Sequence, residues 1–492
     1  MTAQRLLLAA PLLALTLLGG CHRHRHAGPI EASVVGPALG PAHPAFDRGP
    51  VGAPAAALIE ATGQGLVRFD ASGQIVPGVA ARWIVTDNGR SLIFRLPDLP
   101  APGTHPIDAA DVARRIRAAI APASRNPLKP VLGAIDEVDA VTPQVIDIEL
   151  KAPRPNLLQI FAQPGLAMGG QHRGPFALAS LRDGVAVLAP LPDPDADPEA
   201  GHLHRPPVVH LRGERAATAV ARFAAGRSDL MLGGTFDDLP LAHVASLPRD
   251  TLRFDPVKGL FGLAFSDDGG DLIVDSDNRR ALAMAVDRDR IAHLIGAPGW
   301  NPSAAIVAPG TPEIPTPIMP AWASRPLADR RAEAARIIAN WQAGGGKPAP
   351  LRVALPAGPG ARMLFASIAA DWRAIGVQAI RVAPDAPADL RLVDEVAPAD
   401  IASFYLRAFA CARQVPCTPV SEKVLLAARL APTLYERSVL LTQADALITQ
   451  TVPFIAFGPP VRWSLVAQRL DLYRDSPRAF HPLNELRSPP KR

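Results

Sequence analysis

Two cysteines, Cys411 and Cys417, stand close enough in the sequence to react with each other. A disulfide between them would close a small loop and pin it to the surface in an oxidising compartment. The spacing is not Cys-x-x-Cys, and no neighbouring pattern lowers a thiol pKa, which disfavours redox catalysis. The sequence therefore predicts a structural disulfide between Cys411 and Cys417, with two free thiols as the alternative.

Other clusters of reactive residue types do not complete a catalytic or metal site. The aspartates of residues 193–197 imitate the start of a calcium loop, but prolines interrupt it. His22, His24 and His26 alternate with arginines, whose charge opposes a metal cation. The chain contains no Gly-x-Ser-x-Gly, His-Glu-x-x-His or Cys-x-x-Cys motif, and no dinucleotide fingerprint follows a strand. We therefore expect no enzymatic activity, no metal site and no cofactor.

The composition is that of a chain with large cores and no nucleic-acid partner. Its 492 residues are 48% hydrophobic and 20% charged, which predicts two or three domains. The formal charge of +5 rests mostly on dispersed arginines, and aromatic residues make up only 5%. Nucleic-acid binding would require a basic stripe with interleaved aromatics. We expect no nucleic-acid binding.

The first 20 residues have the pattern of a secretory signal peptide. Arg5 is followed by an apolar run from Leu6 to Leu18, and the segment ends in Leu-Gly-Gly before Cys21. This ending resembles the bacterial lipobox, which implies that Cys21 is acylated and becomes the first residue of a lipoprotein. The apolar run of about 13 residues is shorter than the roughly 20 needed to span a bilayer as a helix. An uncleaved membrane anchor and a chance match are the alternatives.

The signal peptide determines where we expect the protein to work. Acyl chains on Cys21 would hold it on a membrane surface, on the periplasmic side of the cell envelope. Residues 21–50 are rich in His, Arg, Pro, Gly and Ala and have no sustained periodicity, which predicts a flexible tether between the anchor and the folded part.

Beyond the tether, strands and helices alternate. The sequence Asp87-Asn-Gly89 between two alternating segments predicts a β-hairpin over residues 83–96. Residues 108–120 have an acidic first turn and a basic later turn, which predicts a helix. A single helix is predicted over residues 277–295, with its cap at Ser276 or Asp277. These elements indicate mixed α/β lobes.

Several segments, in order, resemble the extracytoplasmic solute-binding proteins of ABC transporters, in the family of peptide, oligopeptide and nickel binders known as family 5. The most specific is Asp-Asn-Arg-Arg-Ala-Leu-Ala-Met-Ala-Val-Asp-Arg-Asp-Arg-Ile, and together the segments cover residues 64–70, 75–80, 87–96, 107–112, 174–176, 224–230, 277–291, 375–377 and 452–456. The resemblance implies an α/β, two-lobed periplasmic-binding-protein-like fold of type II. It also implies a hinge and an extra subdomain inserted in the first lobe.

The resemblance also suggests how the chain is divided. We expect a signal peptide in residues 1–20, a tether in 21–50, an inserted subdomain in 68–165 and a second lobe in 259–464. The first lobe is expected to combine three separate segments, residues 51–67, 166–258 and 465–492. The C-terminal tail would thus return to the first lobe.

One segment bears directly on the ligand. In the peptide binders a loop reads Trp-x-x-Asp-x-x-x-Pro, and its aspartate meets the amino group of the ligand. Residues 391–398 keep the aspartate as Asp394 and the proline as Pro398, but Arg391 replaces the tryptophan. The resemblance therefore makes Asp394 the leading ligand-binding residue, with Arg391 either a second one or simply its ion-pair partner.

Four further residues are candidates for the cleft between the lobes. Polar ligand ends hidden by closure need a charged or hydrogen-bonding partner, and Arg407 or Arg462 could meet a carboxylate. Trp463 and Phe265 could line the cleft, although core positions are as consistent with their types.

The function that follows from the resemblance is capture of a peptide-like solute and its delivery to the permease subunits of an ABC importer. We expect a monomer. One alternative is an envelope lipoprotein that keeps the fold but has lost transport-ligand binding. A second alternative is an exported hydrolase.

Overall fold

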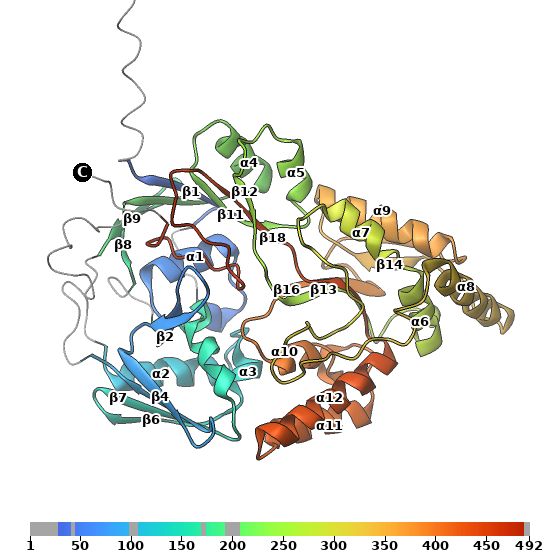
Figure 1. Ribbon diagram of the computed structural model, residues 1–492, viewed down its shortest axis with the longest axis horizontal. Helices are drawn as coiled ribbons and strands as arrows, with labels where there is room; N and C mark the ends of the chain where they lie inside the picture. The colour runs from blue at the N-terminus through green and yellow to red at the C-terminus, as the bar shows by residue number, and fades with distance from the viewer. Residues whose placement is uncertain (1–27, 41–44, 98–106, 169–173, 192–206, 487–492) are drawn as a thin grey trace, which may run out of the picture.

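The computed structural model describes residues 28–40, 45–97, 107–168, 174–191 and 207–486. In these residues the strands form sheets of seven, five, four and two strands. We call the seven-stranded sheet and its helices the first lobe, and the five-stranded sheet and its helices the second lobe. The four-stranded and two-stranded sheets with α2 (Ala109–Ile120) and α3 (Lys129–Leu132) form the subdomain. Figure 1 shows the three parts arranged around a common centre.

The first lobe is built from segments that lie far apart in the sequence. Its central strand β1 pairs in parallel with β10 and β11, and β18, from near the C-terminus, pairs antiparallel to β11. The strand order is β12 (Leu252–Phe254), β18 (Arg462–Val466), β11 (Leu230–Thr235), β1 (Ile30–Val35), β10 (Val209–Glu214), β9 (Val185–Pro190) and β8 (Phe176–Arg182). The helices of this lobe are α1 (Ala53–Thr62), α4 (Ala216–Ala224) and α5 (Leu239–Val244).

Strand β1 corrects the prediction of a tether over residues 21–50. The segment Ile30–Val35 lies in the middle of the sheet, and Ile30, Ala32 and Val34 are buried. Ser33 is also buried, and its hydroxyl donates to Glu214 at 2.5 Å. The prediction was wrong here because a single six-residue strand inside a Pro- and Gly-rich stretch is too short to show a periodicity.

The subdomain packs one helix against a four-stranded antiparallel sheet. The order is β4 (Arg82–Thr86), β5 (Ser91–Arg95), β7 (Val145–Leu150) and β6 (Ile135–Thr142), and β2 (Val67–Phe69) pairs with β3 (Ile75–Pro77) beside it. The predicted hairpin is confirmed, with Asp87, Asn88 and Gly89 at positive φ in its turn. The predicted helix is α2 (Ala109–Ile120), which begins with a capping box between Asp108 and Asp111. The short helix α3 spans Lys129–Leu132.

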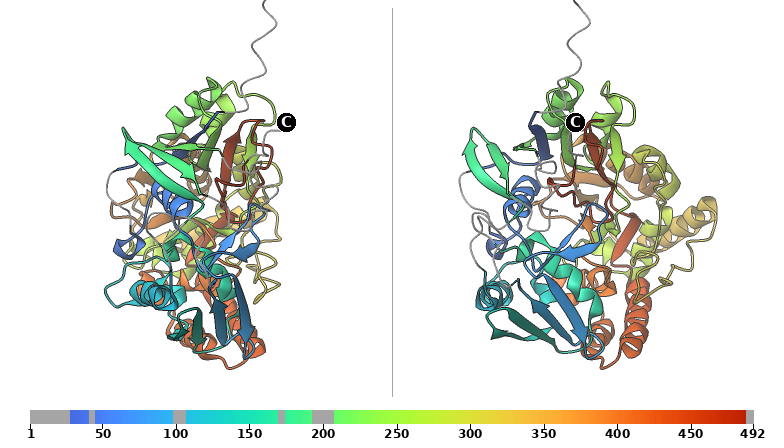
Figure 2. Two further views of the ribbon diagram at one scale, coloured as in Figure 1. Left: turned by 90° about the vertical axis from the view of Figure 1, so that its left-hand side faces the viewer. Right: turned by 60° about the vertical axis from the view of Figure 1, so that its left-hand side comes forward.

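The second lobe has a five-stranded sheet and seven α-helices. The strand order is β15 (Ala379–Val382), β14 (Leu351–Ala354), β16 (Leu390–Val396), β13 (Gly259–Phe265) and β17 (Phe454–Gly458). The helices are α6 (Ser276–Ala285), α7 (Arg288–Ile295), α8 (Leu327–Ala343), α9 (Pro359–Arg373), α10 (Ala402–Arg407), α11 (Pro419–Leu430) and α12 (Leu434–Thr451). Figure 2 shows α11 and α12 at the same end of the molecule as the four-stranded sheet.

The predicted helix over residues 277–295 is two helices, α6 and α7. Val286 has an extended backbone, and Asp287 caps α7 by accepting a hydrogen bond from the Arg290 amide at 2.9 Å. The cap of α6 is Asp275 rather than Ser276 or Asp277, the two predicted positions. The backbone amide of Asp287, freed by the break, donates to Asp371 on α9 at 3.0 Å. The break was missed because the apolar pattern continues through it.

A shared apolar core joins the two lobes. It includes Met231 and Trp463 from the first lobe and Phe261, Trp372 and Phe457 from the second. Among the described residues, no helix is both long and apolar enough to cross a membrane.

Candidate functional site

A large cavity lies between the subdomain and the second lobe. Its volume is about 1010 Å³, at the upper end of the roughly 300–1,000 Å³ typical of ligand pockets. One wall consists of residues 125–134 and 154–157 of the subdomain, and the opposite wall of Pro312, Glu313 and helices α10, α11 and α12. Figure 1 shows α3 beside these helices. A solute in this cavity would contact both parts of the protein.

The described residues that line the cavity are strongly cationic. They include Lys129 and two carboxylates, Glu313 and Glu422. Six arginines accompany them: Arg125, Arg154, Arg407, Arg413, Arg429 and Arg437. Seven cations against two carboxylates leave an excess of five formal positive charges around the cavity. The lining therefore favours an anionic or electron-rich occupant.

Three of the arginines donate to backbone carbonyls on the opposite wall. Arg154 of the subdomain donates to the Arg429 carbonyl at 2.5 Å. In return, Arg407 donates to the Pro130 carbonyl at 2.9 Å and Arg429 to the Gly133 carbonyl at 2.5 Å. These hydrogen bonds join the subdomain to the second lobe, so the arginines hold the two walls of the cavity together.

Arg437 differs from the other three because a carboxylate neutralises it. Its Nε donates to Glu313 at 2.5 Å, and its side chain is only 3% exposed. The other oxygen of Glu313 accepts a hydrogen bond from the amide of Ala402, the first residue of α10. This pair fixes the position of α10 relative to α12.

Burial and mutual repulsion lower the pKa values of the cavity arginines. Burial lowers the pKa of Arg154 to about 9, with a further decrease from the charges of Arg437 and Arg429. Burial also lowers the pKa of Arg407, and the neighbouring charges of Arg429, Arg413 and Arg437 act in the same direction. These positive charges are therefore close together and only partly compensated.

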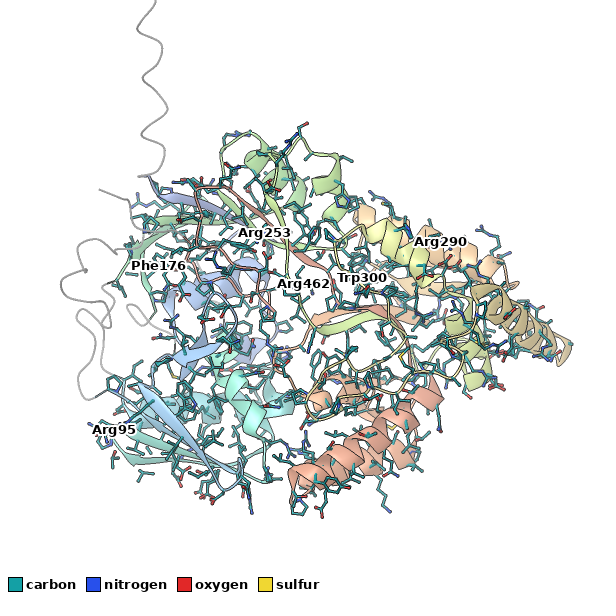
Figure 3. The ribbon with its side chains drawn as sticks, in the orientation of Figure 1. Arg95, Phe176, Arg253, Arg290, Trp300 and Arg462 are labelled. Atoms are coloured by element: carbon teal, nitrogen blue, oxygen red, sulfur yellow. A yellow bond between two sulfur atoms is a disulfide. The ribbon has the colours of Figure 1, made fainter. Side chains whose placement is uncertain are left out.

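The predicted ligand residue Asp394 lies in a strand and is already paired. It belongs to β16, where the resemblance implied a loop. Its carboxylate accepts from Arg462 at 2.8 Å, and Arg462 also donates to the Asp394 carbonyl at 3.0 Å. Burial raises the pKa of Asp394, although Arg462 opposes that shift. Figure 3 shows Arg462 near the middle of the molecule, on β18. Asp394 and Arg462 thus connect the two lobes.

Three other predicted residues lie outside the cavity. Phe265 and Trp463 are each 1% exposed and belong to the shared core, which is the alternative that the sequence left open for both. The indole of Trp463 donates to the Thr235 carbonyl at 2.8 Å. Arg391 donates to the carbonyls of Pro384 and Ala386, and therefore does not pair with Asp394. Of the six predicted ligand residues, the structure brings only Arg407 to the cavity.

Cys411 and Cys417 form a disulfide next to the cavity. The loop that it closes carries Ala412 and Arg413, both of which line the cavity. The amide of Cys411 donates to Glu422 at 3.0 Å, which ties the loop to α11. The disulfide therefore restricts one wall of the candidate site.

Sequence reasoning missed Arg154, Arg429 and Arg437. They come from three different segments, and no local motif surrounds them. The only available signal was the arginine-rich composition, which is dispersed along the chain. Their common location depends on how the subdomain packs against α11 and α12.

A second contact joins three parts of the chain beside the cavity. Arg478 of the C-terminal tail pairs with Asp400 at 2.6 Å and donates to Gln159 of the subdomain at 3.0 Å. Gln159 also accepts from the Asp400 amide at 2.8 Å. Ala399 and Ile401 of the same second-lobe segment are buried in the core of the subdomain.

Some predictions fall on residues that the structure does not cover. Cys21, the histidines at 22, 24 and 26, and the aspartates of residues 193–197 lie outside the described residues. Within the described part of the chain, no group of three His, Cys, Asp or Glu side chains could hold a metal ion.

Solved structures with this fold come from bacterial solute-binding proteins. The murein tripeptide binding protein MppA of Escherichia coli matches with a TM-score of 0.78 and 18% identity, over 94% of this chain and 99% of that one. OppA of Haemophilus influenzae, in complex with RPPGFSPFR, matches with a TM-score of 0.75 and 17% identity over 94% and 99%. MppA in its unliganded open form matches with a TM-score of 0.65 and 19% identity over 94% and 97%.

The family assignment comes from the sequence itself. No curated protein sequence matches the chain. The family model described as bacterial extracellular solute-binding proteins, family 5 Middle, matches residues 74–390, which is more than half of the chain. Together with the two-lobed fold, this match shows that the chain belongs to family 5 of the bacterial extracellular solute-binding proteins.

Proposed function

We propose that this protein is the solute-binding component of an ABC importer. It captures a peptide-like or other small solute in the cavity between the subdomain and the second lobe, and delivers it to membrane permease subunits. The observation that carries this proposal is the cavity of about 1010 Å³ whose two walls belong to different parts of the fold. Proteins of family 5 bind solutes and are not enzymes.

Closure around the solute is the proposed mechanism. A ligand shifts the equilibrium between an open and a closed form only by its difference in affinity for the two. A solute that contacts both Arg154 of the subdomain and Arg407 of the second lobe has this difference, because only the closed form brings the two walls together.

In this proposal the ligand does not bind to Asp394, as the family resemblance implied that it would. Asp394 is already paired with Arg462, so the amino group of a peptide would have to displace that arginine. The cavity instead offers arginines and apolar side chains such as Ile401 and Leu434. The proposal therefore places the solute in this cavity and leaves Asp394 with a structural role.

The location follows from the N-terminal sequence and the family. We propose that residues 1–20 direct export and that acylated Cys21 anchors the mature chain on the periplasmic side of a membrane. Residues 22–29 would then connect the anchor to β1, which begins at Ile30. A short connection keeps the binding protein close to its permease.

A bulky substitution in the cavity tests this function. Ser403 lies on α10 and lines the cavity, so S403W fills part of the space that the solute needs. Native mass spectrometry of protein purified from its host should show one bound small molecule in the wild type and its loss in S403W. The matched control A343W adds the same side chain at the exposed end of α8 and should keep the solute.

Two results would contradict the proposed function. The first is a wild-type protein that carries no solute and binds none from a periplasmic extract, which would favour an envelope lipoprotein without a transport ligand. The second is equal solute occupancy in S403W and A343W, which would place the binding site elsewhere.

A further inference from the structure

Most of the arginines that line the cavity form no ion pair with a carboxylate among the residues that the structure describes, and three of them bind carbonyls on the opposite wall. Arg154, Arg407 and Arg429 donate to backbone carbonyls, whereas Arg437 pairs with Glu313. Carbonyls satisfy hydrogen-bonding groups but carry no net charge. This arrangement therefore gathers more positive charge than the two carboxylates of the lining, Glu313 and Glu422, can compensate.

Other buried arginines of this chain show why the cluster is unusual. Arg279 and Arg288 also donate to carbonyls, at the end of α12 and within β17, but neither is among the residues that line the two cavities described. Arg288 has one like charge beside it, that of Arg330, and Asp371 opposes it, whereas Arg154 has two, those of Arg437 and Arg429, and Glu313 opposes them. Bringing such charges together in a partly buried site costs free energy unless an anion compensates them.

We propose that the solute of this protein is a small anion with at least two acidic groups, carboxylates or phosphates, which bridge Arg154 on the subdomain wall and Arg407 and Arg429 on the opposite wall. This inference rests on the proposed function, since it assigns the chemical class of the solute to the same cavity. The anion supplies the missing negative charge, and it does so only in the closed form.

The geometry of the arginines suits this ligand. A guanidinium has five N–H donors in a rigid fork that matches a carboxylate or phosphate. In the described contacts Arg407 and Arg429 each use one nitrogen to reach a carbonyl, which leaves donors of both side chains for a ligand. The carbonyl contacts also fix the direction of each side chain before the ligand binds.

The apolar part of the lining adds a second requirement. Ile401, Leu426 and Leu434 line the cavity together with the arginines, and Leu426 and Leu434 are exposed. The solute should therefore carry its acidic groups on a hydrocarbon frame. A simple inorganic anion would leave these side chains uncovered.

Three matched tripeptides test the charge requirement. Isothermal titration calorimetry would compare Glu-Glu-Glu, Gln-Gln-Gln and Lys-Lys-Lys, and a phosphoserine tripeptide would separate phosphate from carboxylate recognition. We expect the acidic tripeptides to bind at least about tenfold more tightly than Gln-Gln-Gln, since a hydrogen bond to a charged group contributes that much. Raising the salt concentration should weaken only the acidic probes.

Arginine variants locate the effect in the cavity. The double variant R407Q/R429Q should lose at least about tenfold in affinity for Glu-Glu-Glu, while R407K/R429K should recover part of it because the charge remains. The control R114Q/R280Q removes two surface arginines and the same net charge, and should bind like the wild type. Circular dichroism melting of each variant checks that it is folded.

The outcomes separate this inference from the proposed function. If a neutral or cationic solute co-purifies with the protein, or if Gln-Gln-Gln or Lys-Lys-Lys binds best, the transport function stands and the anion inference is overturned. If R407Q/R429Q binds Glu-Glu-Glu like the control, the inference is also overturned. If no probe binds and no solute co-purifies, the proposed function itself fails. If none of the probes binds but a solute co-purifies, the anion inference stands when that solute carries at least two acidic groups and is overturned when it does not.

Discussion

At the scale of single residues, Asp445 shows what burial of a carboxyl costs this protein. It lies on α12 and is completely buried. It accepts a hydrogen bond from the Ile318 amide at 2.9 Å and a weak one from Thr449 at 3.5 Å, but no cation among the described residues pairs with it. Burial raises the pKa of Asp445 to about 6.

The raised pKa predicts how stability depends on pH at this site. The folded state binds the proton more tightly than the unfolded state, whose pKa is 3.8. Binding of this proton therefore stabilises the folded state in full below about pH 4, and this stabilisation is lost as the pH rises through about 6. At pH 7.5 we expect D445N to be more stable than the wild type by up to about 3 kcal/mol, and the difference should shrink toward pH 4.

Urea unfolding of both proteins between pH 4 and pH 8 checks this prediction. The control D385N removes an exposed carboxyl and should follow the wild type at every pH. If the free energy of unfolding of D445N changes with pH in the same way as that of the wild type, the carboxyl is already ionised at low cost in the folded protein, which would contradict the prediction.

Single residues were the part of the site that sequence predicted least well. Arg407 was found, but Asp394 and Arg462 pair with each other, and Trp463 is part of the core. A residue type such as arginine indicates what chemistry is available, while its role depends on what the fold places beside it. Arg154 meets Arg429 across 275 positions of the sequence, which no local pattern reveals.

At the scale of elements, Asp371 joins three helices of the second lobe. It lies on α9, its side chain is 1% exposed, and it accepts hydrogen bonds from Arg290 of α7 and Arg331 of α8. It also accepts from the Asp287 amide at the break between α6 and α7. Figure 3 shows Arg290 close to α7 and α9.

Removing this carboxylate should destabilise the second lobe strongly. D371A leaves Arg290 and Arg331 without their partner and the Asp287 amide without an acceptor. We expect a loss of about 2–3 kcal/mol in the free energy of unfolding, less than for a fully buried ion pair because Arg290 and Arg331 keep access to water. The control D277N removes an exposed partner of Arg280 and should cost less than about 1 kcal/mol. Equal unfolding midpoints in urea for the two variants would contradict this account.

Elements with local signals were predicted well. The hairpin over residues 83–96 and helix α2 were found because their turn and cap residues lie within the elements themselves. Strand β1 and the break at Val286 were missed because both depend on distant partners. Strand β1 is held by β10 and β11, and the break is compensated by Asp371.

At the scale of the whole molecule, the family resemblance predicted what periodicity could not. The two-lobed α/β fold with an additional subdomain follows from the ordered set of motifs, and the structure and comparisons confirm it. The cavity could not be predicted in the same way, because the residues that touch across it, such as Arg407 and Pro130, are more than 250 positions apart in the sequence.

The contacts across the cavity indicate that this structure is a closed form. Arg154, Arg407 and Arg429 reach carbonyls on the opposite wall, and Arg478, Asp400 and Gln159 join the tail, the second lobe and the subdomain. A few such bonds can be broken and formed again as a hinge moves, whereas the shared core between the lobes would remain intact.

Small-angle X-ray scattering tests the central claim of closure around a solute most directly. Protein purified from its host with the solute bound would be compared with the same protein after unfolding, removal of the solute and refolding. We expect the radius of gyration to be larger without the solute and to return to its first value when the released solute is added back. Superimposable scattering curves, with native mass spectrometry confirming that the solute has been removed, would contradict the account.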